Sequence, residues 1–336
     1  MHAKERRRMN PYSENNTADR REIRSITSRV FFGMDLYLLV FTGLQMVMYV
    51  EYLIAAMFME GVLPEEPSDT VMGIIILAST FAGVVITWLY FARQNAYGRL
   101  YGGEPFTQTM FGRRKAFSLK TIGQCMALIF IIQVGFSFIQ DLLEMLFNRF
   151  GQTLQYSEAL NADYSASIPL LLYATLVGPV AEELVYRGFI MRGLERHGRW
   201  FAIIMSSLIF GLMHGDLQQS LFTIGAGLVF GYVAMEYSLK DSILLHIFNN
   251  AVLGELWPKL IEGLSDTAYV IIVLAILILC AAVCIRMLKG AFRNIREYRE
   301  AYPTVKYAWG SIWNIWFLIF LAYTVYEIVY SVQPLQ

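Results

Sequence analysis

Long apolar runs separated by short polar segments dominate the hydrophobic pattern of this chain. A helix needs about 20 mostly apolar residues to cross a hydrocarbon core about 30 Å thick, and several runs reach that length. The clearest expected spans are residues 30–59, 71–92, 121–147, 268–288 and 309–330. Four shorter or more polar ones are residues 168–186, 200–214, 219–237 and 242–255. The pattern predicts an all-α, polytopic membrane protein with about nine transmembrane helices.

Composition and charge placement support this prediction. Of the 336 residues, 56% are hydrophobic and only 16% charged, which is typical of a membrane protein. Lysine and arginine gather in short cytoplasmic loops, so their positions test the number of spans. With the N-terminus inside, all but two of the 27 Lys and Arg residues fall on the cytoplasmic side. The charges therefore predict an N-in, C-out topology, and acidic outer loops such as "EGVLPEEPSD" agree with it.

The spans suggest four regions. We expect a mobile cytoplasmic tail at residues 1–29, accessory helices and a basic loop at 30–120, a helical core at 121–257, and C-terminal helices at 258–336. The basic N-terminus runs directly into the first span, so no removable signal peptide is expected. We expect an integral membrane protein, in the plasma membrane.

Two basic segments and the cysteines allow simple interpretations. The stretch "KGAFRNIREYREAY" spaces three arginines three apart, each preceded by an apolar residue, which predicts an amphipathic helix in the membrane interface; a solvated linker is the alternative. The loop 93–120 either rests on lipid headgroups or is a plain connector. Cys125, Cys280 and Cys284 all lie within spans without CxxC spacing, so we interpret them as packing residues.

Charged residues in the stretch "AEELVYR" stand at the end of an apolar run. Glu183 and Arg187 are four residues apart, so they share a helix face and can neutralise each other. Glu182 is rotated by about 100° from Glu183 and must face something else. Ionised groups are costly inside a membrane, so their presence favours a functional site.

Two other short spans carry polar residues at the same spacing. "FGLMH" places Phe210 and His214 four apart, and "HIFNN" does the same for His246 and Asn250. Each residue taken alone could be a packing residue that contributes about 1 kcal/mol between helices. Polar residues on three neighbouring spans favour function instead. His2 and His197 lie in segments expected to be polar, and we assign them no role.

These residue types suit hydrolysis. A carboxylate and an imidazole can share the task of removing a proton from water. A second imidazole and an amide can donate hydrogen bonds to the oxyanion that forms at an attacked carbonyl. Since no serine or cysteine stands in a recognisable nucleophile motif, water is the expected attacker.

The three motifs resemble those of a known family. "EELVYR", "FGLMH" and "HIFNN" are similar to the EExxxR, FxxxH and HxxxN motifs of the CAAX prenyl protease and bacteriocin-processing (CPBP or Abi) family, over roughly residues 121–257. The resemblance implies an intramembrane endopeptidase similar to the type II enzymes that remove the last three residues of prenylated CAAX proteins.

The resemblance also implies roles for individual residues. Glu182 would activate the water together with His214, and His246 and Asn250 would form the oxyanion hole. Glu183 and Arg187, which match the second glutamate and the arginine of the first motif, would have orienting and structural roles.

Zinc is the alternative to a metal-free mechanism. Glu182, His214 and His246 could supply three ligands. We favour no cofactor, because HExxH is absent and an amide at Asn250 suits a hydrogen-bond donor better than a ligand. One difficulty is depth: His214 lies about 22 Å from the helix start at Arg199, at 1.5 Å per residue, whereas Glu182 and His246 are expected nearer the cytoplasm. Helix tilt or a misplaced helix boundary must account for the difference.

Three functions compete on the sequence alone. The first is hydrolysis of a membrane-associated peptide or protein, prenylated or not, at a site reached from the cytoplasmic side. The second is a non-catalytic scaffold or bacteriocin-immunity protein with the same fold. The third is an ion-coupled carrier with Glu182 and the histidines as proton relay. Nucleic-acid binding is not expected, since topology accounts for the basic residues.

Overall fold

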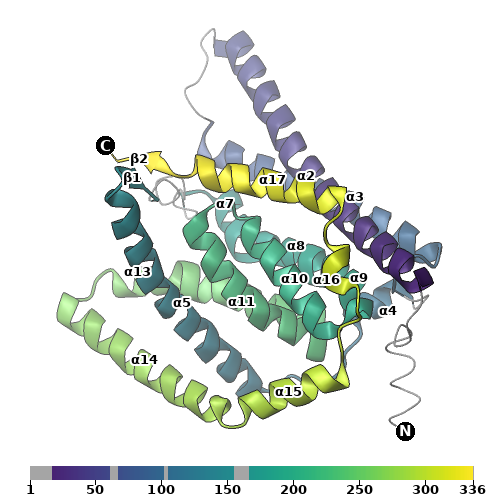
Figure 1. Ribbon diagram of the computed structural model, residues 1–336. Helices are drawn as coiled ribbons and strands as arrows, with labels where there is room; N and C mark the ends of the chain where they lie inside the picture. The colour runs from purple at the N-terminus through teal and green to yellow at the C-terminus, as the bar shows by residue number, and fades with distance from the viewer. Residues whose placement is uncertain (1–16, 61–66, 102–104, 155–165, 336) are drawn as a thin grey trace.

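The computed structural model describes residues 17–60, 67–101, 105–154 and 166–335, most of which lie in helices (Figure 1). His2 and part of the acidic loop that follows the first span lie outside the described residues.

The elements follow each other along the chain as α-helices interrupted by short π-helical and 3₁₀ segments. The N-terminal elements are α2 (Thr17–Glu60), α3 (Asp69–Ala96), α4 (Phe106–Phe111), α5 (Leu119–Asn148) and β1 (Gln152–Thr153). The central elements are α7 (Ile168–Leu172), η3 (Tyr173–Val177), α8 (Gly178–Glu182), η4 (Glu183–Met191), α9 (Arg192–Leu194), η5 (Glu195–His197), α10 (Arg199–Leu212), α11 (Leu217–Glu236), α12 (Leu239–Phe248), η6 (Asn249–Leu256) and α13 (Trp257–Ile261). The C-terminal elements are α14 (Asp266–Leu288), α15 (Ala291–Ala301), α16 (Ala308–Ser311), α17 (Ile315–Tyr330) and β2 (Gln333–Pro334), and β2 pairs antiparallel with β1.

The nine expected spans all fall on helical segments. Within the described residues, six helical stretches are long and apolar enough to cross a membrane, and α10 and α17 are shorter apolar helices. The run 242–255 falls on α12 and η6, and the run 309–330 is divided between α16 and α17. The chain is an all-α, polytopic membrane protein, as predicted. The N-in, C-out orientation stays a prediction.

The first helix begins before the expected span. We expected a mobile tail over residues 1–29, but α2 starts at Thr17, so this expectation is wrong for its second part. Ile23 and Ile26 are buried, and the Thr27 hydroxyl lies 2.9 Å from Nε2 of His197 and 2.8 Å from Oγ of Ser311. His197, expected in a polar segment, is therefore buried against α2. Residues 1–16 lie outside the described part of the chain.

The helical run that contains the first motif is longer than expected, which resolves the depth difficulty for Glu182. We expected it to end at Tyr186, but it continues to His197. The sequence boundary was misplaced because Arg187 and Arg192 resemble the start of a loop, whereas both are buried and paired, with Glu183 and Glu195 respectively. Glu182 therefore lies about as many residues from the end of its run as His214 lies from the start of α10.

The two basic segments are both tied to the protein. In the loop 93–120, α4 buries Met110, and Arg114 donates to both carboxylate oxygens of Glu195. The predicted amphipathic helix is present as α15. Burial raises the pKa of the Tyr298 phenol in this helix, which stays protonated and donates to Oε1 of Glu236 at 2.8 Å. Whether α15 lies in the membrane interface stays a prediction.

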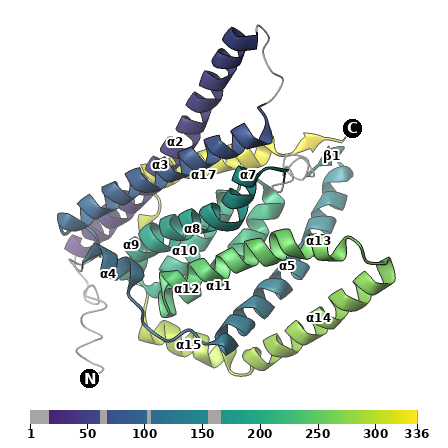
Figure 2. The same ribbon diagram turned by 180° about the vertical axis from the view of Figure 1, so that it is seen from behind.

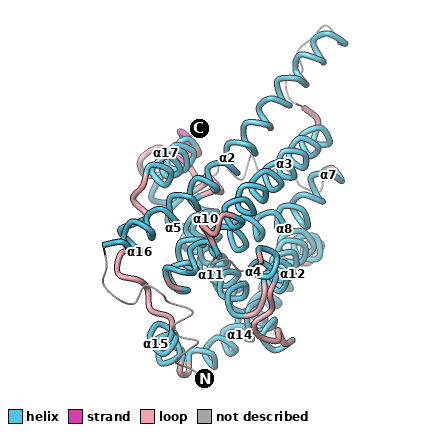
Figure 3. The backbone as a smooth tube through the Cα atoms, turned by 90° about the vertical axis from the view of Figure 1, so that its right-hand side faces the viewer, coloured by secondary structure: helices cyan, strands magenta, loops and turns pink. Residues whose placement is uncertain are grey.

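The helices that carry the motifs occupy the middle of the bundle. Figures 1 and 2 show α10, α11 and α12 between α5 and α14 on one side and α2, α3 and α17 on the other. The end of α2 near Glu60 projects beyond the other helices (Figure 3).

The close approach of α11 to its neighbours involves a glycine, Gly227. Nη2 of Arg187 donates to the carbonyl oxygen of Gly227 at 3.2 Å. A Cβ atom at this position would lie 3.0 Å from that same nitrogen and 3.2 Å from the Phe210 ring. A side chain at this position would therefore require the guanidinium of Arg187 or the Phe210 ring to shift.

Candidate active site

One cavity of about 400 Å³ brings together the residues that the motifs singled out. Glu182, His214, His246 and Asn250 all line it, so α8, the turn after α10, α12 and η6 meet around one space. The remaining lining residues are mostly aromatic or small: Tyr37, Phe41, Tyr173, Ala174, Gly178, Pro179, Tyr186, Phe210, Met213, Gln219, Phe222, Thr223, Ala226, Phe230 and Asn249.

Glu183 and Arg187 lie behind the cavity wall and form the ion pair that their spacing predicted. Both side chains are fully buried, and Nη1 of Arg187 lies 3.0 Å from Oε1 of Glu183. The guanidinium also stands over the Phe210 ring, 4.2 Å from its centroid. The other carboxylate oxygen, Oε2, accepts a hydrogen bond of 2.6 Å from Ser242. The pair thus anchors η4 to α12, as expected for residues with an orienting role.

His246 connects this buried pair to the cavity. Its Nδ1 lies 3.0 Å from Oε1 of Glu183, and its Nε2 lies 3.6 Å from Oε2 of Glu182. The ring is stacked on Phe230 with centroids 4.4 Å apart. Since a carboxylate can only accept, the proton on Nδ1 is assigned to the bond with Glu183, and Nε2 is directed toward Glu182.

Glu182 occupies the position that helix geometry required of it. It does not share Arg187 with its neighbour but lines the cavity, with its side chain 24% exposed against none for Glu183. Two adjacent carboxylates therefore have different surroundings: Glu183 is fixed by Ser242, His246 and its ion pair with Arg187, whereas Glu182 is open to a small molecule in the cavity.

His214 is held by its own helix. Its Nδ1 lies 2.9 Å from the carbonyl oxygen of Phe210, and its ring meets the Phe210 ring edge-on at 5.0 Å. A carbonyl oxygen accepts, so the proton on this ring is assigned to Nδ1. Nε2 is then an acceptor that can hold a water in the cavity.

The amide of Asn250 is fixed at both ends. Its Nδ2 donates to the carbonyl oxygen of Ala174 at 3.0 Å, and its Oδ1 accepts from Nδ2 of Asn249 at 3.1 Å. Asn250 therefore keeps one N–H of its amide for other partners, on a group that cannot rotate without losing two hydrogen bonds.

Pro179 explains why the carbonyl oxygen of Ala174 can accept a hydrogen bond from the Asn250 side chain. In η3 the N–H of Gly178 donates to the carbonyl of Tyr173. The next residue is a proline, which has no N–H to give to Ala174. The amide of Asn250 takes the place of the missing helical donor. Sequence reasoning missed this link, although a proline at the start of a motif helix was visible.

Several other features of the site were also missed. The π-helical segments η3, η4 and η6 all border the cavity or its buried ion pair, in keeping with the frequent occurrence of such segments at functional sites. Tyr37 and Phe41 of α2 form part of the wall although α2 was interpreted as an accessory helix. No pattern in the sequence signalled that contribution, since both are ordinary aromatic residues within an apolar run.

The zinc alternative finds no donor set in this geometry. Within the described residues, no group of three His, Cys, Asp or Glu side chains lies close enough to hold a metal ion. His246 uses one ring nitrogen for Glu183, and His214 uses one for Phe210. A tetrahedral zinc site needs at least three side chains whose ligand atoms converge at about 2.0–2.3 Å from the metal. The metal-free mechanism stays a prediction.

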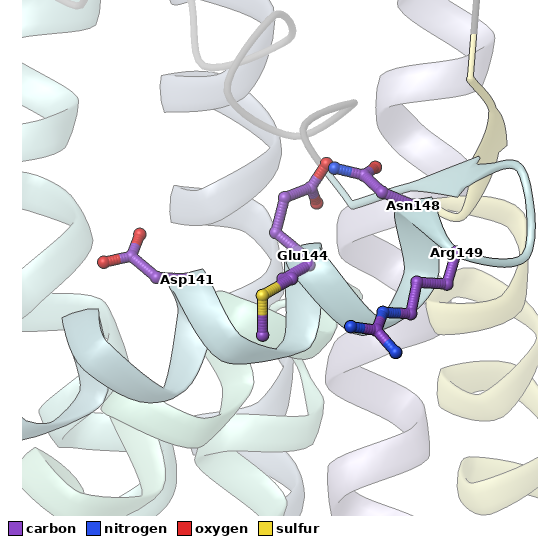
Figure 4. A pocket seen from close by; sticks show the side chains of 5 residues that line it. Asp141, Glu144, Asn148 and Arg149 are labelled. Carbon is purple, nitrogen blue, oxygen red and sulfur yellow. The ribbon is translucent and has the colours of Figure 1, made fainter.

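A second hollow, of about 450 Å³, lies at the far end of α5 (Figure 4). Its carboxylate Glu144 is already used: Oε1 accepts from Thr153 at 2.7 Å and Oε2 from the Leu154 amide at 2.8 Å. Figure 4 shows Asp141 pointing away from Glu144, so the two acids do not converge. Glu144 therefore has a structural role, because it holds the segment that follows α5 in place.

Comparisons with known proteins find one family model and one curated relative that match parts of this chain. Residues 164–252 match a family model described as type II CAAX prenyl endopeptidase Rce1-like. A curated relative, "Putative membrane peptidase YdiL" of Bacillus subtilis (strain 168), is 24% identical over 184 residues, which cover 46% of this chain and 74% of the relative. No solved structure matches the chain significantly. The matched segment includes the glutamates, the two histidines and the asparagine described above.

Proposed function

We propose that this membrane protein is an endopeptidase that hydrolyses a peptide bond with an activated water, because residues 164–252 match the model of the type II CAAX prenyl endopeptidase Rce1-like family. The observation that carries the proposal is the shared cavity: Glu182, His214, His246 and Asn250 line one space within the bundle. The similarity to a relative named as a membrane peptidase supports a protease in general.

Glu182 and His214 would hold and activate the water. The water donates one hydrogen bond to the Glu182 carboxylate and another to Nε2 of His214. As the oxygen attacks the carbonyl carbon, Glu182 accepts the proton, and it delivers this proton to the leaving nitrogen when the C–N bond breaks. One water is consumed, and an acid and an amine are released.

His246 and Asn250 would stabilise the oxyanion. For His246 to donate through Nε2 while Nδ1 stays bonded to Glu183, its ring must be doubly protonated. The second N–H of the Asn250 amide supplies the other hydrogen bond.

The substrate that fits this proposal is a membrane-associated peptide or protein, prenylated or not. It would reach the site from the cytoplasmic side of the plasma membrane and enter between helices from the bilayer. Nucleic acid plays no part in this proposal.

A comparison of membrane proteomes tests the function. Cells that carry the wild type and cells that carry Glu182→Ala are compared by mapping the C-terminal peptides of membrane proteins. We expect new C-termini only with the wild type, and Asp141→Asn, which replaces an acid away from the cavity, should behave as the wild type. Identical C-termini in all three strains would contradict the proposal.

A chelator test addresses the metal. If the chain's own residues activate the water, activity of the purified protein should persist in excess chelator. Loss of activity on chelation, with recovery on adding zinc, would contradict the metal-free mechanism.

A further inference from the structure

We propose that Tyr37 of α2 is a substrate-binding residue: its phenolic hydroxyl donates a hydrogen bond to a main-chain carbonyl oxygen of the peptide, next to the bond that is cut. This inference rests on the proposed function and adds a residue that lies outside the segment 164–252 matched by the family model. The phenol is buried, borders the cavity and has no hydrogen-bond partner within the described residues.

Tyr37 is buried, but its hydroxyl is unpaired. The residue is only 6% exposed, and it lines the cavity. Within the described residues, no hydrogen bond joins its hydroxyl to another group of the protein. Tyr101, which is equally buried, donates to the carbonyl oxygen of Phe189 at 3.1 Å. Because buried polar groups are nearly always paired, the hydroxyl of Tyr37 needs a partner that comes from the cavity, either a water or a ligand.

The ring of Tyr37 is held on two sides. It is stacked on Phe41, with ring centroids 5.7 Å apart and an interplanar angle of 9°. On α3, Gly83 is buried, and a Cβ atom at this glycine would lie 3.0 Å from Cε2 and 3.1 Å from Cδ2 of the ring. Since the phenolic oxygen is bonded rigidly to the ring, a fixed ring fixes the position of the hydroxyl as well.

The phenol lies near the carboxylate that would activate the water. The charge of Glu182 acts on the phenols of Tyr37 and Tyr186, and all three side chains line the cavity. No hydrogen bond joins the Tyr37 hydroxyl to Glu182 within the part of the chain that the structure describes. A group that binds to this hydroxyl from the cavity therefore lies close to the reacting water.

A peptide carbonyl is the partner that fits this position. A peptide group that enters the cavity leaves its hydrogen bonds to water behind, and an unpaired carbonyl in a site of low dielectric is costly. An ionised Glu182 and the Nε2 atom of His214 can only accept. His246 and Asn250 are assigned to the oxyanion. Tyr37 supplies a further donor, and it adds no charge next to Glu182.

Kinetics of Tyr37→Phe test the inference, because this change removes one oxygen atom and keeps the ring. The full chain is reconstituted in phosphatidylcholine vesicles and given short peptides of mixed sequence, anchored by an N-terminal palmitoyl group or by a prenylated cysteine. Only cuts that disappear in Glu182→Gln are counted, and kcat and KM are measured for the peptide that is cut fastest. Absence of cuts in every peptide would refute the proposed function, and the inference with it.

We expect Tyr37→Phe to raise KM about tenfold and to change kcat less than about threefold, because the hydrogen bond is equally strong in the bound substrate and in the transition state. The midpoint of thermal unfolding should not fall, since the hydroxyl has no partner in the described protein. An unchanged KM with cutting intact would overturn the inference and leave the proposed function standing. A lower midpoint would indicate a structural hydroxyl and would overturn it as well.

Tyr90→Phe is the matched control. The hydroxyl of Tyr90 donates to the carbonyl oxygen of Arg29 at 3.0 Å, and this residue is not part of the cavity wall in the described ranges. The control should lower the unfolding midpoint and leave KM unchanged, which is the reverse of the result expected for Tyr37→Phe. A similar rise of KM in both variants would overturn the assignment to Tyr37.

Substrate analogues identify the carbonyl. Each peptide bond next to the cut bond is replaced in turn by a trans-alkene, which keeps the shape of the bond but has no carbonyl oxygen. One replacement should raise KM about tenfold with the wild type and should leave KM unchanged with Tyr37→Phe, since that protein has already lost the hydrogen bond. Equal losses with both proteins at every position would contradict the inference.

Gly83→Ala tests whether the fixed ring positions the hydroxyl. The added Cβ would meet the ring at 3.0 Å, so KM should rise at least about threefold in an otherwise wild-type chain. In Tyr37→Phe the same change should have no further effect on KM. Gly135→Ala, on α5, adds a Cβ with nothing within 4 Å and should leave KM unchanged. A further rise of KM in the double variant would contradict the positioning of the hydroxyl by Gly83.

Discussion

Helices α11 and α14 show opposite relations between composition and burial. The most apolar stretch of α14 has a mean hydropathy of 3.2, and none of it is buried in the protein. The corresponding stretch of α11 has a mean hydropathy of only 1.2, yet 56% of it is buried. The more polar helix lies inside because lipid offers its polar groups no partners, whereas neighbouring helices do.

This difference in burial determines which of the two helices contacts the charged residues of the candidate site. α11 presents the carbonyl of Gly227 to Arg187 and the ring of Phe230 to His246, so its inner position supports the charged residues of η4 and α12. α14 packs mainly along α5 and contributes nothing to the cavity wall within the described residues. Equivalent substitutions in the interior and on α14 should therefore have very different effects.

The largest contrast is expected for the acids. Glu182→Gln should lower kcat by about 10⁴-fold, at the upper end for loss of a general base, because an amide cannot accept the proton of water. Asp266→Asn, in the first turn of α14, should leave kcat unchanged. Peptide cleavage by the reconstituted proteins measures both, and a Glu182→Gln variant with more than a tenth of the wild-type kcat would contradict the assigned role.

The next contrast concerns the arginines. Arg187→Met leaves Glu183 buried without its cation, which should lower the free energy of unfolding by about 3–5 kcal/mol. Arg286→Met, at the exposed end of α14, should change it by less than about 0.5 kcal/mol. Reversible unfolding in mixed micelles compares the two. Equal effects would show that the interior ion pair matters no more than a surface charge.

A smaller effect is expected at Pro179. Pro179→Ala restores an N–H that competes for the Ala174 carbonyl, so the Asn250 amide loses its fixed orientation and kcat should fall about tenfold, or about 1.4 kcal/mol. KM should change little, because the amide acts in the transition state.

A double variant provides a control that distinguishes the positioning of the Asn250 amide from a purely structural role of Pro179. Pro179→Ala added to Asn250→Ala should cause no further loss, since the group it positions is already absent. Pro258→Ala, at an exposed proline of α13, should leave kcat unchanged. Additive losses in the double variant would indicate that Pro179 acts by a different route.

The smallest effect is expected on α14 itself. Ile278 is 69% exposed, so the side chain at this position is expected to face lipid both before and after the substitution Ile278→Ala. The substitution should therefore change the free energy of unfolding by less than about 0.5 kcal/mol. A loss above 1 kcal/mol would show that α14 is buried against a partner and would remove the contrast with α11.

Local spacing in the sequence predicted local geometry well. The four-residue separation of Glu183 and Arg187 predicted their ion pair, and the rotation of Glu182 predicted that it faces elsewhere. The same spacing predicted the contact between Phe210 and His214. These relations depend only on the repeat of a helix, which the sequence makes visible.

Relations between distant segments were harder to predict. The end of the first motif helix was misplaced because the sequence alone does not distinguish a buried arginine from an arginine in a loop. Only the ion-pair partner, which the structure shows, distinguishes the two. The link from Asn250 to Ala174 depends on a π-helical register that no sequence pattern marks. The buried start of α2 depends on Thr27 meeting His197, 170 residues later. The catalytic roles themselves stay predictions.

The aromatic wall supplied by α2 has a consequence for the diversity of such proteins. Tyr37 and Phe41 touch the cavity from a helix outside the segment 164–252 that matches the family model. On the proposed function, part of the surface that meets the substrate is therefore encoded outside the stretch that carries the motifs. Exchange of α2 between two such proteins would then be expected to alter the preference for a target while leaving Glu182, His214, His246 and Asn250 in place.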